Sequence, residues 1–106
     1  LSMGAEYRFK YSQGYPPLVN NDAMAGIVKR CAGQVVGPEN VVEPEPTMGG
    51  EDMAFFLERS QGCFFFLGVG FEGCAGVHNS KFNVNEKNLL TGIEIYVHAA
   101  LNLLSA

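Results

Sequence analysis

The stretch that decides the fold reads CFFFLGV and occupies residues 63–69. It contains no polar side chain, and turn residues bound it on both sides. A continuous apolar run of this length is typical of a β-strand that is covered on both faces. Because helices are predicted before and after it, the order of elements is that of an α/β protein with a covered sheet.

Three helices are predicted around this strand. The first begins at an N-cap within residues 20–22 and runs to about residue 34, with apolar side chains at helical spacing. The second covers residues 51–59, and the third begins at the cap formed by residues 85–86. The third helix carries its apolar side chains on one stripe, which consists of Leu89, Ile93, Tyr96, Val97, Ala100 and Leu104. Residues 70–82 form a glycine-rich loop.

A second, different strand is predicted at residues 5–11, where aromatic side chains alternate with charged ones. Period-two alternation is typical of an antiparallel strand with one buried face. Pro16 and Pro17 follow it and exclude both a helix and an inner strand there. The strand therefore belongs to another sheet, and residues 12–17 mark a domain boundary or linker.

Size, charge and cysteine content exclude several classes of protein. A compact chain of 11.5 kDa exposes about 5,800 Å² against about 16,700 Å² when extended, so about 65% could be buried in one core. The net charge is -4 and no basic cluster occurs, which argues against nucleic-acid binding. The longest apolar run is too short to span a membrane. Three cysteines are typical of a reducing compartment, and we expect a cytoplasmic protein.

Two patterns resemble cofactor or catalytic sites and are set aside. Residues 68–73 (GVGFEG) match a dinucleotide fingerprint, but no helix follows directly and Glu72 would repel phosphate. Cys74-x-x-x-His78, with Cys63 nearby, resembles part of a zinc site or a thiol–imidazole pair. Structural zinc needs four ligands, and a nucleophilic cysteine needs an oriented base. The sequence identifies neither a set of four zinc ligands nor an oriented base for a cysteine.

Two further segments combine residues that carry chemistry. Gly49 and Gly50 would let the main chain approach a ligand, and Glu51 and Asp52 follow in the first turn of a helix. Those carboxylates could equally complement the helix dipole and cap free N–H groups. His78 lies in the loop after the apolar strand, where catalytic groups of α/β proteins gather. A loop histidine bonded only to the main chain is the alternative.

Taken together, three blocks resemble a known family. Residues 47–56 (TMGGEDMAFF) resemble the Gly-Ser-Glu-Asp-Phe block of two-metal amidohydrolases of the aminoacylase/carboxypeptidase type. Residues 77–86 (VHNSKFNVNE) resemble their closing metal-ligand block. Residues 14–20 (GYPPLVN) resemble the return from the lid domain in the hippurate-hydrolase and auxin-conjugate-hydrolase branch. The order and the separations of the blocks agree over almost the whole chain.

This resemblance implies a fold and a division of the chain. The family has an αβα-sandwich catalytic domain with an inserted ferredoxin-like lid and dimerisation domain. Residues 1–15 would then be the last strand of the lid domain, and residues 16–106 the C-terminal part of the catalytic domain. The chain opens on Leu1, which we interpret as a tag residue or the cut end of something longer. The remaining metal ligands, the lid histidine and the glutamate that acts as general base would lie upstream.

The resemblance also assigns roles to residues. His78 matches the last metal-ligand histidine, Gly49 and Gly50 match the loop on the side of the substrate carboxylate, and Glu51 and Asp52 brace that loop. The full-length enzyme would bind two divalent metal ions, zinc or manganese, and would hydrolyse the amide bond of N-acyl amino acids or related small conjugates with a metal-activated water.

The isolated chain is therefore expected to be inactive and unable to hold both metal ions, since only one ligand is identified in it. The full-length enzyme is expected to be a homodimer, and the fragment to self-associate through the apolar faces of a cut domain. A non-catalytic stand-alone or interaction module derived from the same fold is the alternative function. Neither alternative calls for nucleic acid or a membrane.

Overall fold

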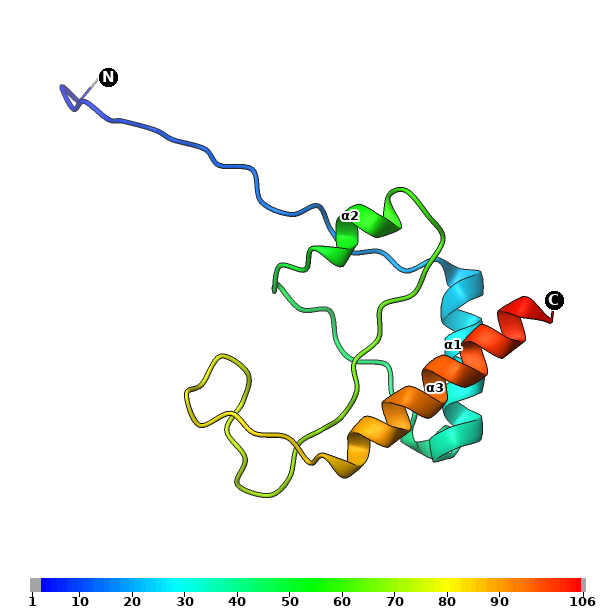
Figure 1. Ribbon diagram of the computed structural model, residues 1–106. Helices are drawn as coiled ribbons and strands as arrows, with labels where there is room; N and C mark the ends of the chain where they lie inside the picture. Colours follow the sequence, from blue (N-terminus) through cyan, green and yellow to red (C-terminus); the bar gives the residue numbers. More distant parts are fainter. Residues whose placement is uncertain (1–2, 106) are drawn as a thin grey trace.

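The computed structural model describes residues 3–105 of the chain. Within these residues the structure has helices and no β-strand, and the only ladder pairing is an isolated parallel bridge between Ala75 and Phe82. Helices α1 and α3 cross and pack against each other, while α2 lies apart from this pair, toward the start of α1 (Figure 1). The elements are α1 (Asp22–Val36), the 3-10 helix η1 (Pro38–Asn40), α2 (Met53–Leu57) and α3 (Lys87–Leu104).

Helix α1 confirms the first predicted helix. The Asn21 side chain caps it by accepting a hydrogen bond from the Met24 N–H at 3.1 Å. The helix ends at Gly37, whose φ of 86° favours glycine. The apolar positions at helical spacing are all buried or half-buried; they are Met24, Ile27, Val28, Cys31 and Val35.

The core is small and lies mainly where α1 and α3 meet. Cys31 and Ala32 of α1 and Ile95 of α3 are buried there, and Ala54 of α2 is buried separately. Gly92 of α3 is buried too, and an added Cβ there would lie 2.9 Å from a methyl carbon of Leu67. The absence of a side chain at residue 92 therefore lets the Phe-rich segment, residues 63–69, approach α3.

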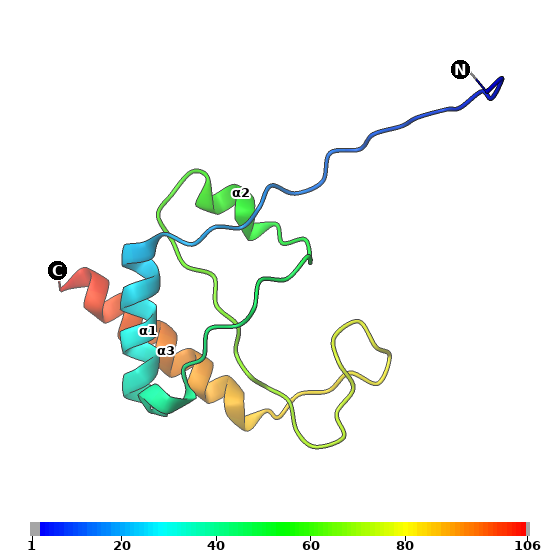
Figure 2. The same ribbon diagram turned by 180° about the vertical axis from the view of Figure 1, so that it is seen from behind.

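The chain exposes far more surface than a compact protein of its size. Its accessible surface is 9284 Å², against about 5,800 Å² for a compact chain of this mass. The described residues span 65 × 39 × 20 Å, and an extended arm leaves the body at the N-terminal end (Figures 1 and 2). The expectation of one well-buried core is therefore wrong for these residues.

Both predicted strands are absent from residues 3–105. The Phe-rich segment forms no ladder, and Phe66 is 65% exposed, so the prediction of a strand covered on both faces is wrong here. Residues 5–11 form the extended arm with every side chain exposed, not a half-buried strand. A strand needs neighbouring main-chain groups for its ladder, and the described residues supply none. The α/β prediction is thus met in its helices only, and residues 1–2 of the predicted lid strand lie outside the described residues.

Helix α3 buries a different face from the predicted stripe. Its buried or half-buried positions are Asn88, Thr91, Gly92, Ile95 and Ala99. The large side chains of the predicted stripe face solvent instead, with Tyr96 67% and Leu104 84% exposed. Tyr96 contacts the Phe65 ring, with ring centroids 5.4 Å apart, but the stripe as a whole stays exposed within residues 3–105. No helix in the described part of the chain is long and apolar enough to cross a membrane.

Candidate functional site

The first and second blocks, residues 14–20 and 47–56, meet through Tyr15. An added Cβ at Gly50 would lie 2.8 Å from Cδ2 of Tyr15, so the ring occupies the space that a side chain would need. The same ring packs edge-on against Phe55, with ring centroids 5.7 Å apart and an interplanar angle of 73°. Gly50 therefore has a packing role toward Tyr15, whereas Gly49 is exposed and meets only the Thr47 hydroxyl oxygen, at 3.6 Å from its added Cβ.

The two carboxylates of the second block differ in their contacts. Glu51 Oε1 accepts a hydrogen bond from the Met53 N–H at 3.1 Å. Asp52 is the N-cap residue of α2, but its side chain makes no capping hydrogen bond. Glu51 thus stabilises the start of the helix, which is the kind of contact a bracing residue makes. Helix α2 is shorter than the helix predicted over residues 51–59. Hydrogen-bonded turns flank it at both ends.

Asn20 ties the first block to the Phe-rich segment. Its Nδ2 donates to the Phe64 carbonyl oxygen at 2.8 Å, and its Oδ1 accepts from the Phe64 N–H at 2.8 Å. The next residue, Asn21, donates its main-chain N–H to the Gly62 carbonyl at 3.0 Å. A side-chain amide here satisfies main-chain groups that a neighbouring strand would otherwise satisfy. In the sequence, Asn20 is a candidate helix cap and the last residue of the block 14–20, and neither feature indicates this role.

The other end of the Phe-rich segment is bonded in the same manner. Asn88 Nδ2 donates to the Gly68 carbonyl at 2.7 Å. The main-chain N–H of Asn85 donates to the Val69 carbonyl at 2.8 Å. Since Asn85 belongs to the third block, residues 77–86, the Phe-rich segment connects the first block to the third.

His78 lies at an exposed position of the loop between the Phe-rich segment and α3. It is the only described non-glycine residue with positive φ, at 63°. A turn directly follows it, in which the Phe82 N–H donates to the Asn79 carbonyl at 2.9 Å and Asn79 Oδ1 accepts from the Lys81 N–H at 2.8 Å. Backbone strain at a histidine is a pointer to function, and the ring is open to solvent.

The structure does not bring all predicted site residues together. The loop that contains His78 (yellow) lies apart from residues 48–52 (green) in Figures 1 and 2. Among residues 3–105, no three His, Cys, Asp or Glu side chains are grouped so that they could hold a metal ion. A metal bound at His78 would therefore need ligands from outside the described residues, as the resemblance implies.

The cysteine patterns that were set aside form no site either. Cys63 and Cys74 are free thiols. Burial raises the pKa of the Cys63 thiol, which lowers the fraction of reactive thiolate. Cys74 Sγ accepts a hydrogen bond from the Phe71 N–H at 3.4 Å and so has a local structural contact.

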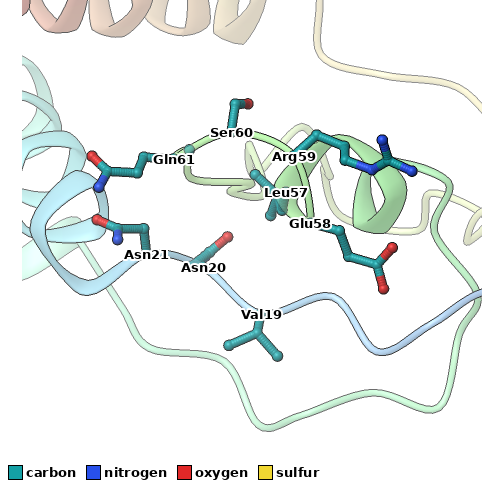
Figure 3. Close-up of a pocket in the computed structure, with 9 residues that line it drawn as sticks. Val19, Asn20, Asn21, Leu57, Glu58, Arg59, Ser60 and Gln61 are labelled. Atoms are coloured by element: carbon teal, nitrogen blue, oxygen red, sulfur yellow. The ribbon is translucent and has the colours of Figure 1, made fainter.

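A polar pocket of about 390 Å³ lies between the start of α1 and the turn after α2. In Figure 3, Asn21 and Gln61 lie at one end of it, and Glu58 and Arg59 extend toward the other. None of the residues predicted to bind metal or substrate lines this pocket. It therefore supplies no chemistry to the candidate site.

Comparison with known proteins identifies the family. The model of Peptidase family M20/M25/M40 matches residues 4–102. The chain belongs to this family. It is similar to a Bacillus subtilis protein named as an amidohydrolase, YhaA, with 40% identity over 101 residues, which cover 92% of this chain and 26% of that protein.

Two further relatives extend the comparison. The IAA-amino acid hydrolase ILR1-like 4 of Arabidopsis thaliana is 34% identical over 93 residues, covering 85% of this chain and 21% of the relative. The N-acetyl-L-cysteine deacetylase of Bacillus subtilis is 31% identical over 97 residues, covering 92% and 22%. The chain thus spans about a quarter of the length of these relatives. No solved structure matches the chain.

Proposed function

We propose that this chain is the C-terminal part of a metal-dependent amidohydrolase that hydrolyses the amide bond of N-acyl amino acids or related small conjugates. The observation that carries the proposal is the family match over residues 4–102, which includes all three blocks. The substrate class is supported by relatives named for the hydrolysis of IAA-amino acids and the deacetylation of N-acetyl-L-cysteine.

His78 is the residue of this chain that would hold a metal ion. A neutral imidazole is a common ligand of zinc and leaves the charge of the ion largely unneutralised. Two bound divalent ions, zinc or manganese, would polarise the substrate carbonyl and lower the pKa of a bound water to about 7. The exposed ring and the positive φ of His78 support this role, because the loop presents the imidazole away from the core.

The other predicted site residues act around the substrate. Gly49 is exposed and without a side chain, so its main chain can approach a ligand. Gly50 has the same freedom on the side away from Tyr15, and Glu51 keeps the following turn in place through Met53. Asp52, with no capping bond of its own, belongs to the same supporting turn.

The proposal also covers the parts of the enzyme outside this chain. A full-length protein, as long as the relatives, supplies the general base, the other metal ligands and the remaining part of the catalytic domain. The 106 residues alone are therefore inactive. Residues 1–15 act as the last strand of a lid and dimerisation domain, which agrees with the exposed aromatic side chains of the arm. The full enzyme is a cytoplasmic homodimer.

A chimera tests this function. The 106 residues replace the matched quarter of YhaA, and purified chimera is assayed on N-acetyl-L-cysteine, other N-acetyl amino acids and an IAA-amino acid. We expect amide hydrolysis that a chelator abolishes and that zinc or manganese restores, with no hydrolysis by the 106 residues alone. A folded chimera that is inactive on all of these substrates, while YhaA hydrolyses at least one of them, would instead favour the non-catalytic module.

A further inference from the structure

The ring of Tyr15 contacts two parts of the second block. An added Cβ at Gly50 would lie 2.8 Å from Cδ2 and 3.3 Å from Cε2 of this ring, so the ring occupies the side-chain position of residue 50. The same ring packs edge-on against Phe55 of α2. The main chain that carries Tyr15 passes α2 in both views of the molecule (Figures 1 and 2). Tyr15 therefore contacts both the glycine pair, Gly49 and Gly50, and the helix that follows it.

The glycine at residue 50 is explained by this ring and not by its own backbone. The glycines with positive φ among residues 3–105 are Gly4, Gly37 and Gly73. The φ of Gly50 thus lies outside the left-handed region that favours glycine. The same holds for Gly49, where an added Cβ would meet the Thr47 hydroxyl oxygen at an ordinary 3.6 Å. Residue 49 has room for a side chain, whereas the Tyr15 ring excludes one at residue 50.

Hydrogen bonds do not fix the main chain of the glycine pair. Within residues 3–105, no main-chain hydrogen bond reaches residues 42–50, and such bonds begin again at Glu51 and Asp52. The conformation of the pair therefore depends on packing. The side chain that packs on Gly50 is that of Tyr15, which comes from a distant part of the sequence.

Tyr15 is itself held in a defined position by the residues that follow it. The next two residues are prolines, which fix their own φ and confine the preceding residue to extended conformations. Further along the same segment, Asn20 is bonded to the main chain of Phe64. A stiff and anchored segment thus carries the ring. Because Tyr15 is 57% exposed, its removal takes away this contact without opening the core.

We propose that Tyr15 is a positioning residue for the substrate. Its ring holds the glycine pair in the conformation in which the main chain meets the carboxylate side of the substrate. This inference deepens the proposed function and rests on it, because the glycine pair is assigned to substrate binding there. Tyr15 acts through the main chain of the pair, so loss of the ring weakens substrate binding and leaves the chemical step unchanged.

Backbone dynamics of the 106-residue chain test the proposal without reference to activity. Nitrogen-15 relaxation gives the order parameters of the Gly49 and Gly50 amides in the parent chain and in three variants. We expect values near about 0.85 in the parent and in Tyr15→Phe, and below about 0.6 in Tyr15→Ala. Tyr11→Ala is the matched control, because Tyr11 is 76% exposed on the arm, and it should match the parent. Equal values in the parent and in Tyr15→Ala, or low values already in the parent, would overturn the proposal.

Steady-state kinetics of the YhaA chimera test the effect on the substrate. The substrate is the N-acyl amino acid that the chimera hydrolyses best. Tyr15→Ala should raise KM about tenfold and change kcat less than about twofold, because the lost contacts bind the ground state and the transition state equally. Tyr15→Phe keeps the ring and should keep both constants. An unchanged KM in Tyr15→Ala, or a loss confined to kcat, would overturn the proposal and leave the proposed function standing.

A double variant shows whether Tyr15 and Gly50 act together. The methyl group of Gly50→Ala displaces the ring, so this variant should raise KM as much as Tyr15→Ala does. Combining the two changes should raise KM no further, since each of them frees the same main chain. Additive effects on KM would overturn the proposal. An inactive parent chimera would contradict the proposed function instead, and the order parameters would then decide whether Tyr15 positions the glycine pair.

Discussion

Replacing Asn20 tests how the Phe-rich segment is held in place. The side chain makes two hydrogen bonds of 2.8 Å to the main chain of Phe64, both in a partly buried setting. A hydrogen bond contributes about 0.5–1.5 kcal/mol net, so Asn20→Ala should lower the free energy of unfolding by about 1–3 kcal/mol. The chain has no tryptophan, so urea unfolding is best followed through the circular dichroism of α1 and α3.

Two further variants at residues 20 and 21 separate this pair of bonds from other effects. Asn20→Asp keeps an oxygen that accepts from the Phe64 N–H, but it places a carboxylate oxygen against the Phe64 carbonyl oxygen. Protonation of that carboxylate restores a donor to the carbonyl. Stability lost at neutral pH should therefore partly return in acid. Asn21→Ala, which removes the helix cap, should cost about 1 kcal/mol with no such pH dependence. The reasoning is refuted if Asn20→Ala unfolds at the same urea concentration as the exposed-site variant Gln13→Ala.

Three other changes probe local structure. Gly37→Ala should lower the free energy of unfolding in urea by about 1–3 kcal/mol, because φ is 86° at that residue. Gly33→Ala, inside α1 with only ordinary contacts, should raise it by about 0.5–1 kcal/mol. A change of the same sign in both variants would contradict this reasoning. His78→Val should lower the free energy of unfolding by about 1–2 kcal/mol, because φ is 63° at residue 78, and His78→Gly should not lower it. Equal melting temperatures of these two variants would show that the strain is absent. The hydrogen bond and charge of Lys29 lower the pKa of Glu43, so Lys29→Gln should raise that pKa in an NMR titration. Because the pKa of Glu43 is lowered in the folded protein, the stability that this pair contributes is present above the ordinary glutamate pKa. It is lost as the pH falls through the pKa of the folded protein. An unchanged Glu43 titration in the variant would count against the pair.

The helices could be predicted because their signals are local. Asn21 caps α1 and Gly37 ends it as expected, and both act through neighbouring main-chain groups. The strands could not be predicted in the same way, because a strand is completed by residues distant in sequence. The apolar pattern of residues 63–69 predicts a covered strand, and this prediction is wrong here because the described residues lack neighbouring strands.

The candidate site could also be predicted only where its signals are local in the sequence. The three blocks could be identified from the sequence, and Glu51 makes a contact of the bracing kind. The Asn20–Phe64 pair was missed, because hydrogen bonds between residues 44 positions apart leave no periodic signal. The packing of Tyr15 on Gly50 was missed for the same reason. Its only trace in the sequence is a glycine where the family commonly has serine.

The most direct test of the account is the metal content of the YhaA chimera with and without the His78 imidazole. His78→Asn is the variant to use, since asparagine tolerates positive φ and removes the ligand without adding strain. Metal analysis of the purified proteins, loaded with zinc or manganese, should show about one ion fewer per subunit in the variant, together with nearly complete loss of amide hydrolysis. Unchanged metal content and near-normal hydrolysis in the variant would contradict the role of His78.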